Sequence, residues 1–258
     1  MEADLEAGLR ALAGGVPQGE LEAAVLVARW LDPMFSPEQV RAQLFGMAER
    51  CGTDLPWEFL RGLGFAGDTD RYDAPENSHI ARVLERQTGI PISLAIVLIE
   101  VARHAGHTAV GISFPGHFLV RVDDTLVDPF AMRAIDPATA LAGLPEAQRH
   151  RSTGELFASA DAPTIAFRML NNLKAAFLRR SALHRAVEAL DGQIALLPGY
   201  PTIYVERGDL WRRLGNHACA RVDFENALAR AEDLNATALV IELKKRLAGF
   251  SAEPTIVH

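Results

Sequence analysis

The chain has 258 residues, of which 49% are hydrophobic and 23% are charged, and its formal net charge is −7. This composition is that of an ordinary globular protein, and the length allows two domains and a sizeable core. The acidic balance argues against a nucleic-acid-binding protein that relies on bulk positive charge. The two cysteines, Cys51 and Cys219, belong to no CxxC motif or Cys/His cluster. We therefore expect reduced thiols, with no disulfide framework, metal site or cofactor.

The sequence contains no segment typical of targeting or of membrane insertion. Its first residues, MEADLEAGLRAL, are acidic and amphipathic, unlike a secretory signal. The longest apolar run, from Ile90 to Ile99, stops at Glu100, well short of the roughly 20 residues that a membrane span needs. We therefore expect a cytoplasmic protein that binds neither a membrane nor nucleic acid.

Helical spacing of apolar residues dominates the first part of the chain. Ser36-Pro37 is a strong helix start, because serine can cap a helix and proline suits its first position. Asn77 or Ser78 is expected to cap a later helix, and Gly89 to end it. Together these signals predict helices over residues 4–14, 20–31, 37–51, 57–63, 78–88 and 91–105, with a loop over 64–77.

The stretch from Glu85 to Phe130 is the most informative part of the sequence. Pro91 begins a helix whose residues 92–101 are apolar almost all round, so this helix belongs inside the fold. β-branched and aromatic residues then predict strands over residues 109–113, 117–122 and 125–130, with Asp123-Asp124 as a turn. The fold class expected is α+β, with a small antiparallel sheet against a buried helix.

The turn length sets the register of the last two strands. A two-residue turn places Val122 opposite Thr125 and Leu119 opposite Asp128. His117 and Asp128 then lie on one side of the sheet as diagonal neighbours, about 7–8 Å apart. Ser93 lies in the first turn of the buried helix, where unpaired N–H groups favour negative charge. Ser93, His117 and Asp128 are therefore candidates for nucleophile, base and orienting acid.

Each candidate also has a purely structural explanation. Ser93 can satisfy backbone groups in the first turn of the helix, and His117 can be a hydrogen-bonded strand residue. Asp128, before Pro129, is typical of a strand end or turn. His104 and His107 have helical spacing, but no third ligand accompanies them, so they predict no metal site.

The chain from Pro163 onward contains an internal repeat with an offset of 34 residues. This is the period of the tetratricopeptide repeat, a helical hairpin. The aligned pairs are Phe177 with Trp211, Ala186 with Ala220 and Leu190 with Phe224. Lys174 departs from the pattern, because it stands where Gly208 stands in the second copy. Two copies are fewer than a free-standing array needs, so we expect this module, residues 163–258, to pack on a first domain of residues 1–162.

Four motifs in order carry a resemblance to a known family: NSHIARVLERQTGIPISLAIVLIEVARHAG, FPGHFLVR, LVDPF and RMLNNLKAAFLRR. With the repeats that follow, the chain resembles the SirB-type bacterial family over roughly residues 20–235. The resemblance implies a transglutaminase-like domain, related to the papain-like enzymes, followed by tetratricopeptide repeats. It also implies a catalytic Cys at the start of the central helix and a His and an Asp on later strands, which His117 and Asp128 match.

The cysteine of that pattern is missing. With Gly89 and Ala95 aligned to the family, the nucleophile position falls on Pro91. Ser93 is about 200° further round the helix, so it does not replace a residue at position 91 geometrically. Two hypotheses follow. The favoured one is a non-catalytic protein that binds a peptide or protein partner through a degenerate cleft and the repeats. The other is a hydrolase or acyl-transfer enzyme that uses Ser93, His117 and Asp128.

Overall fold

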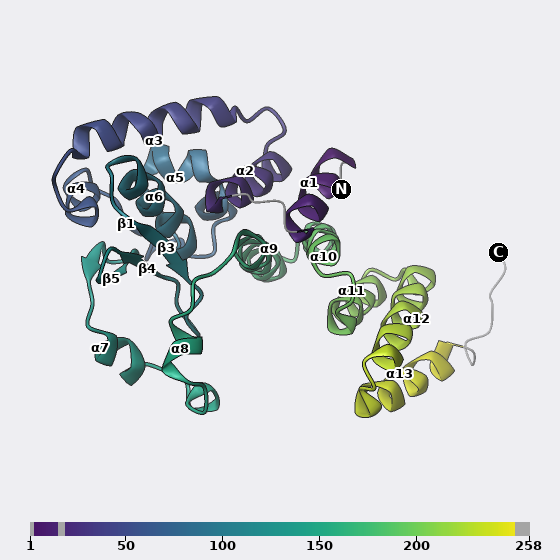
Figure 1. Ribbon diagram of the computed structural model, residues 1–258. Coiled ribbons are helices and arrows are strands. Elements are labelled where there is room, and N and C mark those ends of the chain that lie inside the picture. The colour runs from purple at the N-terminus through teal and green to yellow at the C-terminus, as the bar shows by residue number, and fades with distance from the viewer. Residues whose placement is uncertain (1–2, 15–18, 251–258) are drawn as a thin grey trace. The chain divides into compact units, whose positions relative to one another are not determined.

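The computed structural model describes residues 3–14 and 19–250 (Figure 1). Internal contacts divide them into two compact units, one ending at Asn172 and one beginning at Leu173. The division falls within helix α9 (Ala162–Arg179), later than the boundary between residues 162 and 163 that the sequence predicts. That boundary stays a prediction.

Six helices come first in the N-terminal unit: α1 (Ala3–Ala13), α2 (Glu20–Leu31), α3 (Pro37–Cys51), α4 (Pro56–Gly62), α5 (Ile80–Arg86) and α6 (Pro91–His104). The sequence predicts all six, with shifts at some ends. The cap of α3 is confirmed, because the Ser36 hydroxyl accepts a hydrogen bond from the backbone N–H of Gln39 at 3.4 Å. Gly52 follows this helix with a positive φ of 55°, a region that glycine occupies readily.

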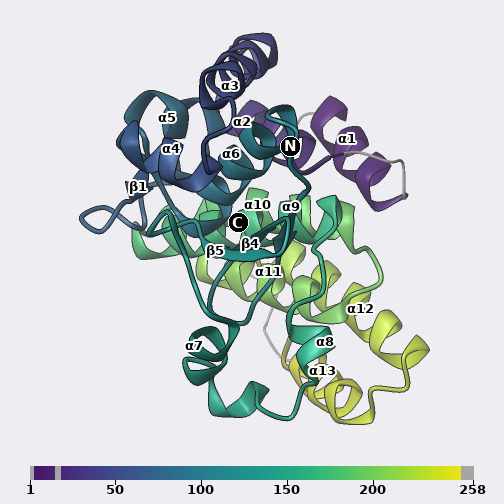
Figure 2. The ribbon, with the colours of Figure 1, turned by 60° about the vertical axis from the view of Figure 1, so that its left-hand side comes forward.

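Helix α6 is the centre of the N-terminal unit. Every residue from Ile92 to Ala102 is buried, as the all-round apolar pattern predicts. The helix contacts α2, α3, α4 and α5 as well as strands β3 (Ala109–Ile112) and β4 (Leu119–Val122). Figures 1 and 2 show helices on one side of α6 and the sheet on the other. Burial on all sides explains why nearly every position in this helix is apolar.

The main sheet has four antiparallel strands in the order β3, β4, β5 (Thr125–Asp128) and β6 (Arg133–Ala134). The predicted hairpin register is confirmed, because Val122 pairs with Thr125 and Val120 pairs with Val127. Asp123 in the turn has a φ of 50°, the left-handed conformation that a tight two-residue hairpin requires. The α+β class is therefore correct.

One additional strand and the two ends of helix α5 differ from the sequence prediction. The stretch expected to be only loop contains strand β1 (Ala66–Gly67), which pairs in parallel with β2 (Thr88–Gly89). The N-cap of α5 is His79, without a side-chain cap, and Gln87 ends this helix with a φ of 56°. Asn77 does not cap because its amide donates to the carbonyls of Arg71 and Tyr72 instead.

The predicted strand over 117–122 is also too long. Strand β4 begins at Leu119 because a turn precedes it: Gly116 has a φ of 76°, and the His117 N–H donates to the carbonyl of Phe114 at 3.0 Å. His117 therefore lies in the approach to the strand. The pleat of the sheet does not fix the direction of its side chain.

A connecting region follows the sheet. It contains the short helices α7 (Pro137–Ala142) and α8 (Thr153–Leu156). Leu144 and Leu156 from this region pack in one cluster with Ile112 and Leu126 of the sheet. The connection is therefore part of the N-terminal unit.

The C-terminal unit is helical, with α10 (Leu183–Leu196), α11 (Pro201–Arg213), α12 (His217–Asp233) and α13 (Thr237–Phe250). The 34-residue offset is visible in its geometry, because α10 and α12 begin at Leu183 and His217. Ser181 and Gly215, which are related by the same offset, both have positive φ. The aligned pairs Ala186 with Ala220 and Leu190 with Phe224 are all fully buried.

Candidate functional site

Ser93 lies at the start of α6, where its hydroxyl group satisfies the backbone. The side chain is fully buried. Its Oγ donates to the carbonyl of Ile90 at 3.0 Å and accepts from the N–H of Ile90 at 3.2 Å. The turn is tight, because a Cβ added to Gly89 would lie 2.7 Å from this Oγ. The bond from the Ile90 N–H matches the structural explanation of Ser93, since a helix start leaves such N–H groups unpaired, and the Ile90 carbonyl also accepts from Leu94 N–H at 3.1 Å.

His117 is exposed and lies between the turn at Gly116 and strand β4. Its backbone is held at both ends, because its N–H donates to Phe114 and its carbonyl accepts from Arg168 Nη2 at 2.8 Å. Within residues 3–14 and 19–250, no hydrogen bond or ion pair engages its imidazole ring. The ring is therefore presented to solvent on a fixed backbone.

Asp128 is the last residue of β5 and is partly buried. Its Oδ1 accepts hydrogen bonds from the N–H groups of Phe130 at 2.9 Å and Ala131 at 3.4 Å. The carboxylate thus orders the turn after the strand, as a strand-end aspartate does. This turn is also bonded to strand β1, because the carbonyl of Phe130 accepts a hydrogen bond from Gly67 N–H at 2.8 Å.

The three predicted site residues share no hydrogen bond in the described structure. The Ser93 hydroxyl and Asp128 Oδ1 bond to nearby backbone groups. Among the described residues, the His117 ring forms no hydrogen bond with either side chain. Their assignment as nucleophile, base and orienting acid stays a prediction.

Arg168 of α9 is a residue beside His117 that the sequence reasoning missed. Its guanidinium donates to Ser113 Oγ at 2.8 Å, to the carbonyl of Phe114 at 3.2 Å and to the carbonyl of His117 at 2.8 Å. It also lies 5.4 Å from the ring centre of Phe118, a cation–π distance. The only available signal was its place as the first residue of the RMLNNLKAAFLRR motif, which predicts no partner.

The loop before α5 is fixed by a buried polar network. Arg86 donates to Asp68 Oδ2 at 2.6 Å and to Asn77 Oδ1 at 3.0 Å. Burial would raise the pKa of Asp68, but hydrogen bonds from the Arg71 backbone and from Arg86 hold that pKa below its ordinary value. The same loop carries Tyr72, whose exposed ring lies 6.0 Å from the ring of Phe130.

His79 is buried without hydrogen bonds to its side chain. Neither ring nitrogen has a partner among the described residues, and the side chain is 5% exposed. The ring packs edge-on against Phe35, with centroids 5.2 Å apart. Burial lowers the pKa of His79 and the charge of Arg82 adds to this, while Asp32 and Glu85 oppose it. The neutral imidazole is the favoured form here.

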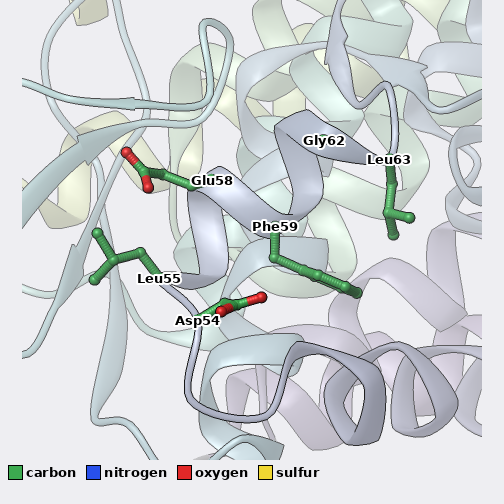
Figure 3. Close-up of a pocket in the computed structure, with 6 residues that line it drawn as sticks. All are labelled: Asp54, Leu55, Glu58, Phe59, Gly62 and Leu63. Carbon is green, nitrogen blue, oxygen red and sulfur yellow. The ribbon is translucent and has the colours of Figure 1, made fainter.

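A shallow hollow of about 380 Å³ lies along α4, away in sequence from the predicted site residues (Figure 3). Leu55, Phe59 and Leu63 give it an apolar wall, and Asp54 and Glu58 add two carboxylates. Ser93, His117 and Asp128 do not line it.

The two histidines at the end of α6 have partners within the protein. His104 Nδ1 lies 2.8 Å from the carbonyl of Glu100, and His107 Nδ1 lies 2.8 Å from Asp123 Oδ2. In the part of the chain that the structure describes, no group of three His, Cys, Asp or Glu side chains is arranged to hold a metal ion. None of the described helices has the length and apolar composition needed to cross a membrane.

Residues 38–171 match the family model for the transglutaminase-like superfamily. A UPF0162 protein of Xylella fastidiosa (strain 9a5c) is 37% identical over 178 residues, which cover 64% of this chain and 63% of that protein. A UPF0162 protein of Pseudomonas aeruginosa is 30% identical over 235 residues, 84% of this chain and 86% of that protein.

A shorter match connects the chain to a eukaryotic protein. F-box only protein 21 of Mus musculus is 41% identical over 59 residues, which are 23% of this chain and 9% of that protein. No solved structure gives a significant match. The extent of the family match and the P. aeruginosa relative show that the chain belongs to the transglutaminase-like superfamily and to the bacterial UPF0162 proteins.

Proposed function

We propose that this chain is a non-catalytic member of the superfamily that binds a peptide or protein partner and acts as a regulatory protein. The observation that carries the proposal is the Ser93 hydroxyl, which is fully buried and engaged with both backbone groups of Ile90. A nucleophile must reach its substrate and be activated by a base. A hydroxyl that caps its own helix start does neither.

The cysteines support the same proposal. Position 91, where the family resemblance places the nucleophile, is a proline. Cys51 is buried at the end of α3, and burial raises the pKa of its thiol, with Asp54 adding to the effect. Nucleophilic cysteines need a lowered pKa. The environment of Cys51 therefore disfavours the thiolate form that a nucleophile needs.

We further propose that the chain is of the SirB type, with a C-terminal unit that is a pair of tetratricopeptide-type repeats and contributes to partner binding. Its support is the 34-residue offset between α10 and α12 and the burial of aligned residues such as Ala186 and Ala220. Repeat modules of this kind usually bind peptides or proteins. A cytoplasmic location fits such a role.

One observation favours the alternative, a hydrolase or acyl-transfer enzyme. His117 is exposed, its backbone is held at both ends, and the β4–β5 register brings the approach to β4 alongside Asp128. For catalysis, Ser93 would first have to give up its bonds to Ile90. That rearrangement leaves the buried N–H of Ile90 without a hydrogen-bond partner, which costs about 1–3 kcal/mol.

A peptide-binding experiment separates the two functions. The full chain is used to select ligands from a displayed peptide library, and each selected peptide is incubated with wild type and with Ser93→Ala. The proposal expects equal affinity for the two proteins and peptides recovered with unchanged mass. Cleavage of a peptide, or an acyl-protein adduct that Ser93→Ala abolishes, would establish the enzyme instead.

A further inference from the structure

The guanidinium of Arg168 is partly buried, and no carboxylate within residues 3–14 and 19–250 pairs with it. Its three hydrogen bonds go to a hydroxyl and two carbonyls, of Ser113, Phe114 and His117. Burial lowers the pKa of Arg168, and Tyr72 opposes the effect. A partly buried charge without an opposite charge is costly, because desolvation is not offset by attraction.

Three other partly buried arginines of this protein pair with carboxylates, whereas Arg121 and Arg230 bond to carbonyls as Arg168 does. Arg86 pairs with Asp68 at 2.6 Å, and Arg103 pairs with Glu20 at 2.6 Å. Arg207 pairs with both Asp191 and Asp223. Arg168 differs from these three, although the chain carries an excess of acidic residues. Its positive charge is therefore available to a group outside the chain.

The surroundings of Arg168 suit a ligand. His117, whose carbonyl accepts from Arg168, is exposed and its ring has no partner within the described residues. Tyr72 is exposed, and it lies close enough to Arg168 to affect the pKa of the guanidinium. Arginine has five N–H groups, so three bonds leave others that can donate.

We propose that Arg168 and His117 form a binding site for a carboxylate group of a peptide partner, with Tyr72 as a flanking aromatic contact. This inference rests on the proposed peptide-binding function and specifies the chemistry of its ligand. A carboxylate accepts paired hydrogen bonds from guanidinium N–H groups at short distance, and such charge-assisted bonds are about twice as strong as neutral ones. The proposal commits to one carboxylate, because the site offers one permanent positive charge.

The test is an NMR titration of the full chain with labelled arginine Nε–H and histidine ring groups. The probes are N-acetylated, C-amidated tetra-glutamate, the matching tetra-glutamine peptide and inorganic phosphate. We expect tetra-glutamate to shift the Arg168 and His117 signals, with at least tenfold weaker binding of tetra-glutamine. Equal binding of the two peptides, or stronger binding of phosphate than of tetra-glutamate, would overturn the carboxylate assignment.

Three variants separate the effect of the Arg168 charge from the effect of the hydrogen bonds that Arg168 makes. Arg168→Gln removes the proposed charge and is expected to weaken tetra-glutamate binding about tenfold. Ser113→Ala removes one of the bonds that hold the guanidinium but keeps its charge. Arg121→Gln is the matched control, because Arg121 also donates to a carbonyl, that of Phe157 at 3.0 Å. Arg121→Gln is expected to bind tetra-glutamate within about twofold of wild type, and Ser113→Ala to bind it less tightly than wild type but more tightly than Arg168→Gln.

Loss of tetra-glutamate binding in Arg121→Gln equal to that in Arg168→Gln would show that binding follows the overall charge of the protein and not a site at Arg168, and would overturn the inference. The result is distinct from a failure of the proposed function. If library peptides bind but their affinity does not change in Arg168→Gln, the carboxylate site is wrong while peptide binding stands. If library peptides are cleaved, the proposed function is wrong.

Discussion

The Ser93 hydroxyl and the backbone of Ile90 form a reciprocal pair of hydrogen bonds, 3.0 Å from Oγ to the carbonyl and 3.2 Å from the N–H to Oγ. The pair closes the first turn of the most buried helix in the N-terminal unit. Ser93→Ala therefore removes the side-chain partner of a buried N–H. We expect a loss of about 1–2 kcal/mol in the free energy of unfolding, measured by urea denaturation.

Ser159→Ala is the control for this measurement, since Ser159 is a serine outside the helix start and is exposed. A change of less than about 0.5 kcal/mol is expected there. If Ser93→Ala were as stable as wild type, the capping role of the hydroxyl would be wrong.

Asn77 ties the loop that carries Tyr72 to helix α5. Its amide donates to the carbonyls of Arg71 and Tyr72, and its Oδ1 accepts from Arg86. Because this side chain is fully buried, Asn77→Ala leaves several polar groups unpaired. We expect a loss of about 2 kcal/mol or more in the free energy of unfolding.

The matched control is Asn171→Ala. Asn171 lies in an exposed position on α9, where water solvates its amide. Its expected effect is within about 0.5 kcal/mol. Equal losses in the two variants would contradict the structural role of the buried network.

His79 makes the stability of the protein depend on pH. Its pKa is lowered in the folded state, with burial as the main cause. Between the folded-state pKa and the ordinary value of 6.5, the unfolded chain binds the proton and the folded chain does not. The contribution of neutral His79 to the free energy of unfolding is therefore complete above pH 6.5. This contribution is lost as the pH falls toward the pKa of His79 in the folded state.

The comparison variant is His79→Phe, which keeps an aromatic ring against Phe35 and cannot be protonated. Wild type should lose stability relative to this variant on acidification from pH 6.5, with a slope of at most about 1.4 kcal/mol per pH unit. Parallel stability curves for the two proteins would exclude His79 as the titrating group.

Gly208 permits the close approach of α11 to α12. A Cβ at this position would lie 2.7 Å from the ring of Phe224, which is fully buried and cannot move aside without repacking. We expect Gly208→Ala to destabilise the C-terminal unit by about 1–3 kcal/mol, measured by hydrogen exchange of the α11 and α12 amides.

Gly46→Ala serves as the control, because Gly46 is also helical but its added Cβ would meet nothing within 4 Å. Alanine favours a helix over glycine by about 1 kcal/mol, so this variant is expected to stabilise α3. A stabilising effect of Gly208→Ala would show that the helices do not approach as described.

The sequence predicts the architecture well where local signals and burial agree. The apolar run after Pro91 predicts a buried helix, and Asp123-Asp124 predicts the register of the hairpin; both are confirmed. The start of α5 could not be predicted, because Asn77 has two competing uses. It can cap a helix locally, or bond to Arg71, Tyr72 and Arg86, and only the folded loop decides between them.

The candidate functional site also depends on contacts that cannot be predicted from local sequence. The position of His117 before β4 depends on a turn at Gly116, which the strand propensity of its neighbours conceals. The bonds of Arg168 reach back more than fifty residues along the chain, to Ser113, Phe114 and His117. No local pattern encodes such contacts, so the missing carboxylate partner becomes visible only in three dimensions.

The central claim is that Ser93 supports the start of α6 and performs no chemistry. Intact-protein mass spectrometry after incubation with a fluorophosphonate, which reacts with activated serines, tests it most directly in wild type and Ser93→Ala. No adduct is expected on either protein under conditions that label a serine hydrolase fully. A single adduct on wild type that is absent from folded Ser93→Ala would contradict it.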